Sequence, residues 1–161
     1  IDEDNKEKQS INYSLNEKEW QSLTQIMNML QDRPKYNEQK FNSEHYQLLN
    51  KLLTWPVDKL PPVLDLIRVL SLHPAFADYC SKNFNFVKKI LKIGGNGLVH
   101  AVNGMLTCRI VINLFNRRVT AKVLEENYTI IINNLLFNMM VEEKKNTRLA
   151  FVRVLLHYTY A

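Results

Sequence analysis

Glycine and proline are scarce in this chain, and their scarcity excludes folds that depend on many turns. Only 4 glycines and 5 prolines occur among 161 residues. Sandwiches and barrels join many short strands through turns rich in these residues, whereas helices with short connections need few of them. The length suits one domain, and 46% hydrophobic residues are too many for a disordered chain. The composition therefore predicts an all-α fold.

Long apolar runs are absent as well. No run reaches the roughly 18 residues that a membrane-spanning helix needs, so we expect no membrane partner. The polar N-terminus, IDEDNKEKQS, has no apolar stretch and does not resemble a signal peptide. The chain has two cysteines, Cys80 and Cys108, each in an apolar helical context. We expect two buried thiols, with a disulfide as the alternative, and hence a cytoplasmic or nuclear protein.

Motifs for catalysis and metal binding are also missing. The four histidines and two cysteines show no metal-ligand spacing. The glycine-rich segment 94–97 lacks the Lys-Ser/Thr pair of a phosphate-binding loop, and no Gly-x-Ser-x-Gly motif occurs. We therefore expect no metal, no cofactor and no enzymatic activity.

Helix start and stop signals divide the remainder of the chain. Residues 1–13, with four acids and two lysines in the first ten, are predicted to be a disordered acidic lead-in, and residues 14–161 one helical domain. Ser14 and Glu17 form a capping-box pattern that predicts the first helix start. Pro61 and Pro62 fit the first turn of a later helix. Residues 129–132 have strand propensity, but their apolar neighbours continue a helical stripe, so we expect a helix there.

Three arginines recur at the same place in apolar helices. They stand in the segments Ile-Arg-Val-Leu, Cys-Arg-Ile-Val and Val-Arg-Val-Leu, as Arg68, Arg109 and Arg153, which are 41 and then 44 residues apart. A period of this size, with two or three helices in each interval, is typical of armadillo and HEAT repeats. Because each such unit buries its apolar face against the next, the sequence predicts a right-handed superhelix of about three to four repeats.

The repeated arginines are candidate binding residues. A buried unpaired guanidinium is costly, so three at one register predict a shared exposed edge along the concave groove of the stack. A polar residue lies four positions after two of them, and Asn can donate and accept at once, as a peptide backbone requires. The candidate peptide-binding residues are Arg68, Arg109, Asn113, Arg153 and His157. The alternative is structural pairing, for example of Arg68 with Asp65 inside the core.

The net charge of +5 is unevenly distributed, with eight cations and no acid between Lys82 and Lys122. Such a stretch is a solvated basic face or a site for an acidic partner. Nucleic acid is a less favoured partner, because most aromatics lie on helical apolar faces, where they cannot stack on bases; they include Trp20, Trp55, Phe115 and Phe151. A structural or oligomerisation domain is the third alternative, and an open last repeat would favour self-association.

The sequence resembles the PUL domain in three blocks. The first is Trp55-Pro56-x-Asp58, followed by Pro62-x-Leu64-Asp65-Leu66-Ile67-Arg68 and then His73-Pro74. The second runs from Arg109 to Phe115, with Asn113 four residues after the arginine. The third is Leu155-Leu156-His157-Tyr158-Thr159, where the family often has Asn-Tyr, so His157 departs from its pattern.

This resemblance implies an armadillo-like fold of about six repeats, of which the chain would cover the first three to four as an incomplete PUL domain. The family occurs at the C-terminus of PLAA-type ubiquitin-binding proteins. The resemblance implies binding to the acidic C-terminal tail of the AAA ATPase valosin-containing protein, in ubiquitin-dependent protein degradation. An acidic tail also suits the basic stretch.

Overall fold

A computed structural model describes residues 13–95, 100–136 and 145–160. The described residues form nine α-helices and two short 3₁₀ turns, Arg33–Lys35 and Val57–Lys59, and they contain no strand. The helices are α1 (Glu17–Gln31), α2 (Ser43–Leu52), α3 (Leu60–Leu70), α4 (Pro74–Lys82), α5 (Phe84–Gly95), α6 (Ala101–Leu114), α7 (Arg118–Glu126), α8 (Tyr128–Leu135) and α9 (Lys145–Tyr160). The predicted all-α fold is confirmed, including the helix at residues 129–132. The predicted lead-in falls on residues 1–13, which lie outside the described residues apart from Tyr13.

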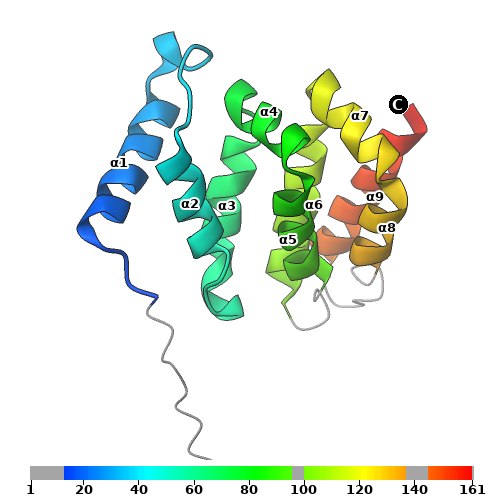
Figure 1. The fold of residues 1–161 in the computed structure, drawn as a ribbon. Helices are drawn as coiled ribbons and strands as arrows, with labels where there is room; N and C mark the ends of the chain where they lie inside the picture. Colours follow the sequence, from blue (N-terminus) through cyan, green and yellow to red (C-terminus); the bar gives the residue numbers. More distant parts are fainter. Residues whose placement is uncertain (1–12, 96–99, 137–144, 161) are drawn as a thin grey trace, which may run out of the picture.

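The helices stack as three-helix repeats: α1 to α3, α4 to α6 and α7 to α9 (Figure 1). Corresponding helices of the second and third repeats pack on each other, α4 on α7, α5 on α8 and α6 on α9. The first and second repeats meet chiefly through α3 and α6. The repeat predicted from the arginine spacing is therefore confirmed, and each arginine lies on the third helix of its repeat.

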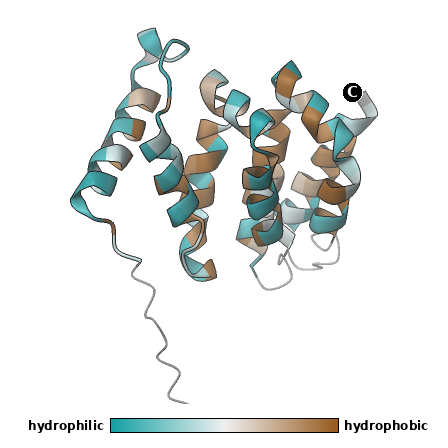
Figure 2. Cartoon of the chain, viewed as in Figure 1, coloured by the Kyte–Doolittle hydropathy of each residue, from teal (hydrophilic) through white to brown (hydrophobic). Residues whose placement is uncertain are grey.

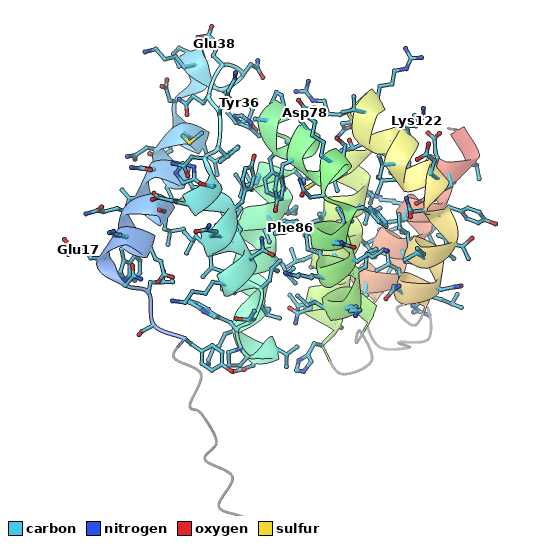
Figure 3. The ribbon with its side chains drawn as sticks, in the orientation of Figure 1. Glu17, Tyr36, Glu38, Asp78, Phe86 and Lys122 are labelled. Carbon is cyan, nitrogen blue, oxygen red and sulfur yellow. The ribbon has the colours of Figure 1, made fainter. Side chains whose placement is uncertain are left out.

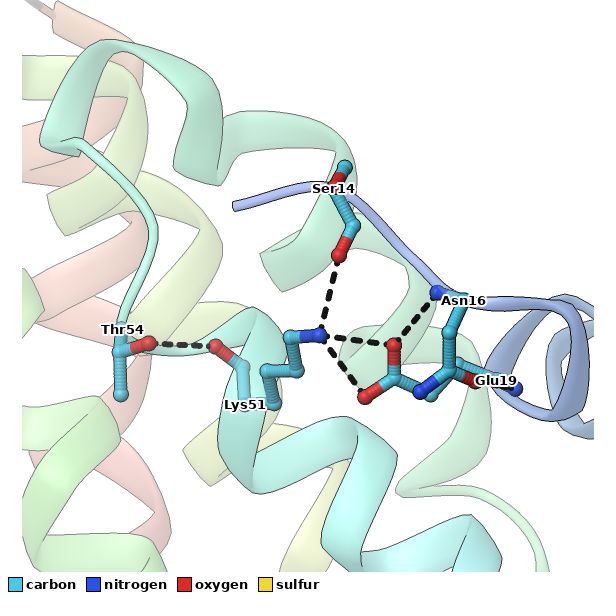
Figure 4. A network of polar contacts seen from close by, with 5 residues as sticks. All are labelled: Ser14, Asn16, Glu19, Lys51 and Thr54. Atoms are coloured by element: carbon cyan, nitrogen blue, oxygen red, sulfur yellow. Dashed lines mark hydrogen bonds and ion pairs between the residues drawn. The ribbon is translucent and has the colours of Figure 1, made fainter. Parts of the chain in front are cut away.

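The first helix begins two residues later than predicted. The capping box is made by Asn16, whose side chain accepts the Glu19 N–H at 2.9 Å, while the Glu19 carboxylate accepts the Asn16 N–H at 2.8 Å. Lys51 of α2 donates to the same carboxylate at 2.7 Å and to the Ser14 carbonyl at 3.0 Å (Figure 4). Ser14 is thus held through its backbone, and Glu19 ties the start of α1 to α2.

Two glycines near the end of α5 allow close approaches, one to α6 within the second repeat and one to α8 of the third repeat. A Cβ at Gly94 would stand 2.5 Å from Cβ of Thr107 on α6, and one at Gly95 would stand 2.8 Å from the backbone oxygen of Asn134 on α8. Only glycine lets α5 pack this closely against both neighbours. The predicted break at 94–97 is therefore partly helix, and residues 96–99 lie outside the described residues.

The core is largest around α3 and α6, which are mostly hydrophobic, whereas α1 is mostly hydrophilic (Figure 2). Cys80 and Cys108 are buried free thiols, and burial raises the pKa of both. The prediction that Trp20 belongs to the core is wrong, because its side chain is 57% exposed. The buried face of α1 is centred on Ile26 instead. No helix in the described part of the chain combines the length and hydrophobicity needed to cross a bilayer.

Candidate functional site

The three arginine-bearing helices lie side by side, with α6 packed between α3 and α9. Arg68 is half-buried, and Arg109 and Arg153 are exposed. The three arginines occupy the third helix of each repeat, but their side chains differ in their surroundings. The shared edge along a concave groove stays a prediction.

Arg68 is paired with an acid of its own helix. Its Nε donates to Oδ1 of Asp65 at 2.7 Å, and the two side chains are 31% and 54% exposed. The pairing alternative raised from the sequence is thus present, but the pair lies at the surface and not inside the core. An exposed ion pair of this kind contributes only about 0.2–1 kcal/mol. Arg68 is consequently the arginine whose charge is already partly compensated.

Arg109 and Arg153 face a shared shallow pocket of about 50 Å³ between α6 and α9. Neither forms an ion pair with an acid in the described ranges. The rest of the pocket is lined by Ile112, Asn146, Leu149 and Ala150. Two guanidinium groups without an acidic partner among the described residues therefore line one pocket together with the apolar side chains of Ile112, Leu149 and Ala150, an arrangement that suits a carboxylate next to a small apolar group.

Asn113 holds α6 against α3. Its Nδ2 donates to the backbone carbonyl of Arg68 at 2.8 Å. One amide hydrogen is therefore committed to the stack, whereas the sequence suggested that the whole amide would grip a peptide. Among the described residues no donor reaches its Oδ1, so this atom is the part of Asn113 that a peptide N–H could use.

His157, four residues after Arg153, has a different role from Asn113. Its Nδ1 bonds the Arg153 carbonyl of its own helix at 2.8 Å, and its ring lies 5.4 Å from that of Phe115 on α6. The neighbouring Tyr158 makes the cross-helix contact, donating from its hydroxyl to the Leu124 carbonyl at 3.1 Å. His157 therefore forms no hydrogen bond from α9 to α6 of the kind that Asn113 forms from α6 to α3.

The basic stretch read from the sequence is divided between surfaces. Lys88 and Lys89 lie on α5, where Lys89 donates to Oδ1 of Asn50 at 2.7 Å and Lys88 stands 5.5 Å from the centre of the Phe84 ring. Arg109 is the member of the stretch that lines the α6–α9 pocket. Lys88 and Lys89 thus make contacts within the fold. The positive charge at the pocket comes from Arg109 of the basic stretch and from Arg153, which lies outside that stretch.

The family model of the PUL domain matches residues 1–161. The chain belongs to the PUL domain family. This membership indicates a protein-interaction module. Comparison with curated proteins and comparison with solved structures give no match. Within the described residues, no group of three or more histidine, cysteine or acidic side chains is arranged to hold a metal ion.

The residues that carry the PUL resemblance are largely structural. Leu64 and Ile67 are fully buried in the core, and Trp55 packs against it. His73 is the N-cap of α4, where its side chain accepts the Ala75 N–H. The first block therefore identifies the fold, whereas the pocket is lined by residues of the second and third repeats, on α6 and α9. Sequence reasoning missed Ile112 and Asn146, because only the packing of α6 on α9 brings them beside the arginines.

Proposed function

We propose that this PUL domain binds the acidic C-terminal tail of the AAA ATPase valosin-containing protein through the pocket between α6 and α9. The observation that carries the proposal is the position of Arg109 and Arg153, two exposed guanidinium groups without an acidic partner among the described residues, on either side of one pocket. We further propose that the domain acts in ubiquitin-dependent protein degradation in the cytoplasm or nucleus, with a binding and not a catalytic role.

Charge and shape both support an acidic peptide as the ligand. A carboxylate can accept paired hydrogen bonds from a guanidinium, and two arginines line the pocket. The apolar lining of Ile112, Leu149 and Ala150 suits a short hydrophobic side chain next to the acid. Asn113 could accept a peptide N–H through Oδ1, whereas Arg68 and His157 do not line the pocket.

Fluorescence anisotropy with a labelled acidic C-terminal peptide tests the proposal. Charged hydrogen bonds contribute about 1.5–3 kcal/mol each when shielded, so Arg109→Ala or Arg153→Ala should weaken binding about tenfold at low salt. Arg68→Ala should weaken it less, because Asp65 already offsets the charge of Arg68. Affinity should fall as salt rises, since both groups are exposed.

Lys92→Ala is the matched control, because it removes one positive charge from an exposed position on α5. Its affinity should equal that of the unmodified chain. Equal losses in Lys92→Ala and Arg109→Ala would indicate a nonspecific charge effect and would contradict the assigned pocket. A parallel RNA titration that gives tighter binding than the peptide would favour the nucleic-acid alternative instead.

A further inference from the structure

Two buried histidines stand at helix N-termini on either side of the junction between the first and second repeats. His45 is 4% exposed near the start of α2, and His73 is fully buried at the start of α4. Both belong to the small set of buried polar residues in the described part of the chain. Neither takes part in the α6–α9 pocket, so their burial needs a separate explanation.

Both rings use Nδ1 as a hydrogen-bond acceptor for a backbone N–H. Nδ1 of His45 accepts the Asn42 N–H at 3.2 Å, and the Asn42 side chain accepts the His45 N–H at 2.9 Å, which completes the capping box of α2. Nδ1 of His73 accepts the Ala75 N–H at 3.2 Å and caps α4. An imidazole can accept a hydrogen bond only at an unprotonated nitrogen, so both rings must be neutral in this structure.

The second nitrogen fixes the tautomer of His45. Its Nε2 lies 2.9 Å from Oε1 of Gln25 on α1, and because this oxygen can only accept, Nε2 carries the proton. Nε2 of His73 is buried and has no partner with hydrogen-bond geometry among the described residues. A second proton on either ring would place an N–H against the backbone N–H that it now accepts. Protonation would thus remove the side-chain cap of α4 and half of the capping box of α2.

Phe41 joins the two histidines. Its ring lies 6.0 Å from that of His45 and 4.9 Å from that of His73, and Tyr36 packs on His73 at 4.6 Å. Tyr36 and Phe41 belong to the segment between α1 and α2. Figure 3 shows Tyr36 beside α4. The first repeat therefore contacts the second through this aromatic segment and the rings that cap α2 and α4.

We propose that His45, Phe41 and His73 form an acid-sensitive clasp, which holds the first repeat on the second while both imidazoles are neutral and loosens when they take up protons. The clasp is separate from the α3–α6 contact, so acid should release the segment before α2 and the helix caps before the inner helices separate. The proposal does not depend on the ligand of the α6–α9 pocket.

The surroundings of the rings set the direction of the effect. Burial lowers the pKa of His45 and of His73 below the ordinary value of 6.5. The negative charge of the nearby Glu44 carboxylate partly offsets the lowering of the His45 pKa. The Tyr36 backbone partly offsets the lowering of the His73 pKa, whereas the positive charge of Arg117 lowers that pKa further. The unfolded chain therefore binds more protons than the folded one below pH 6.5, so stability is complete above that pH and falls as the pH decreases towards the folded pKa values.

Urea unfolding at a series of pH values from 7.5 to 5 tests the clasp. The unfolding equilibrium constant should rise by up to about tenfold per pH unit for each histidine that binds a proton only on opening. His45→Gln with His73→Asn should remove most of this dependence, because Gln suits the third position of a capping box and Asn is a good N-cap, and neither titrates in this range.

His100→Asn is the matched control. His100 precedes α6 as its N-cap, but among the described residues its side chain forms no capping hydrogen bond. The control variant should keep the full pH dependence of the unmodified chain. A double variant that remains as acid-sensitive as the unmodified chain would overturn the proposal, as would loss of the dependence in His100→Asn alone.

NMR of the unmodified chain decides the matter if the double variant fails to fold. Nitrogen-15 imidazole spectra should show two rings protonated at Nε2 whose pKa lies below the ordinary value of 6.5. The amide exchange of Asn42 and Ala75, corrected for intrinsic rates, should accelerate between pH 6.5 and 5 more than that of amides within α6. Rings that titrate at 6.5 or above, or Asn42 and Ala75 amides that stay protected at pH 5, would contradict the clasp.

Discussion

Helices α6 and α9 occupy the same position in successive repeats, yet corresponding apolar residues are buried in α6 and exposed in α9. With Arg109 matched to Arg153, the buried residue Cys108 corresponds to Val152, which is 38% exposed. Buried Val111 corresponds to Leu155, which is 37% exposed. The two helices have similar sequence patterns, so the difference comes from their neighbours.

Helix α6 packs against two inner helices, α3 on one side and α9 on the other. Helix α9 packs against only one inner helix of the described chain, α6. In the described part of the chain the outer face of α9 carries Val152, Leu155 and Leu156, which are exposed and follow one another at helical spacing. An apolar residue in a repeat protein is therefore buried by the following repeat as much as by its own. The comparison predicts that equivalent substitutions in α6 and α9 have unequal effects.

Leucine truncation should show the largest difference. Leu114 of α6 is fully buried, so Leu114→Ala should lower the free energy of unfolding by about 2–5 kcal/mol, through lost burial and the cavity left behind. Leu156→Ala removes the same atoms from an exposed position of α9 and should cost less than about 1 kcal/mol. Urea unfolding of both variants measures the difference, and equal losses would mean that α9 is covered in solution.

The exposed face of α9 should also affect association. We expect the chain to self-associate through this face, because a continuous apolar stripe on a helix lowers its free energy by burial against a second apolar surface. Val152→Glu with Leu156→Glu should shift the sedimentation coefficient to that of a monomer. Val119→Glu is the control, because Val119 is also an exposed apolar residue but lies on α7. A chain that is monomeric at high concentration without any substitution would contradict the expectation.

The arginine period was the most informative part of the sequence, because it follows from a constraint that every repeat shares. A guanidinium on an apolar helix must reach the surface, so its spacing reports the spacing of the repeats even where the other residues differ. Helical periodicity likewise outweighed strand propensity at residues 129–132, which form half of α8. Both predictions used patterns that can be read from the sequence of one helix, or from the recurrence of one helix pattern along the chain.

The incorrect predictions, the start of the first helix and the burial of Trp20, concern features for which the local sequence allows more than one outcome. Ser14 and Asn16 each precede a glutamate by three residues, and the contact of Glu19 with Lys51 on α2 favours the second cap. Trp20 has suitable helical spacing for the core, but α1 packs chiefly on α2 and buries only one narrow face. The pocket residue Asn146 could not be predicted, because it is far from Arg109 in the sequence. Only the packing of α6 on α9 brings the two residues together.

The smallest effect should come from the polar residues that follow the two arginines. Asn113→Ala removes the hydrogen bond to the Arg68 carbonyl and leaves that carbonyl partly buried, so it should lower the free energy of unfolding by about 0.5–1.5 kcal/mol. His157→Ala removes a bond to its own exposed helix and should cost less than about 0.5 kcal/mol. Asn113→Asp is the sharper test, because aspartate is close in size but has no amide hydrogen to donate. If Asn113→Asp is as stable as the unmodified chain while peptide binding falls, Asn113 serves the ligand and not the α3–α6 contact, and the assigned structural role is wrong.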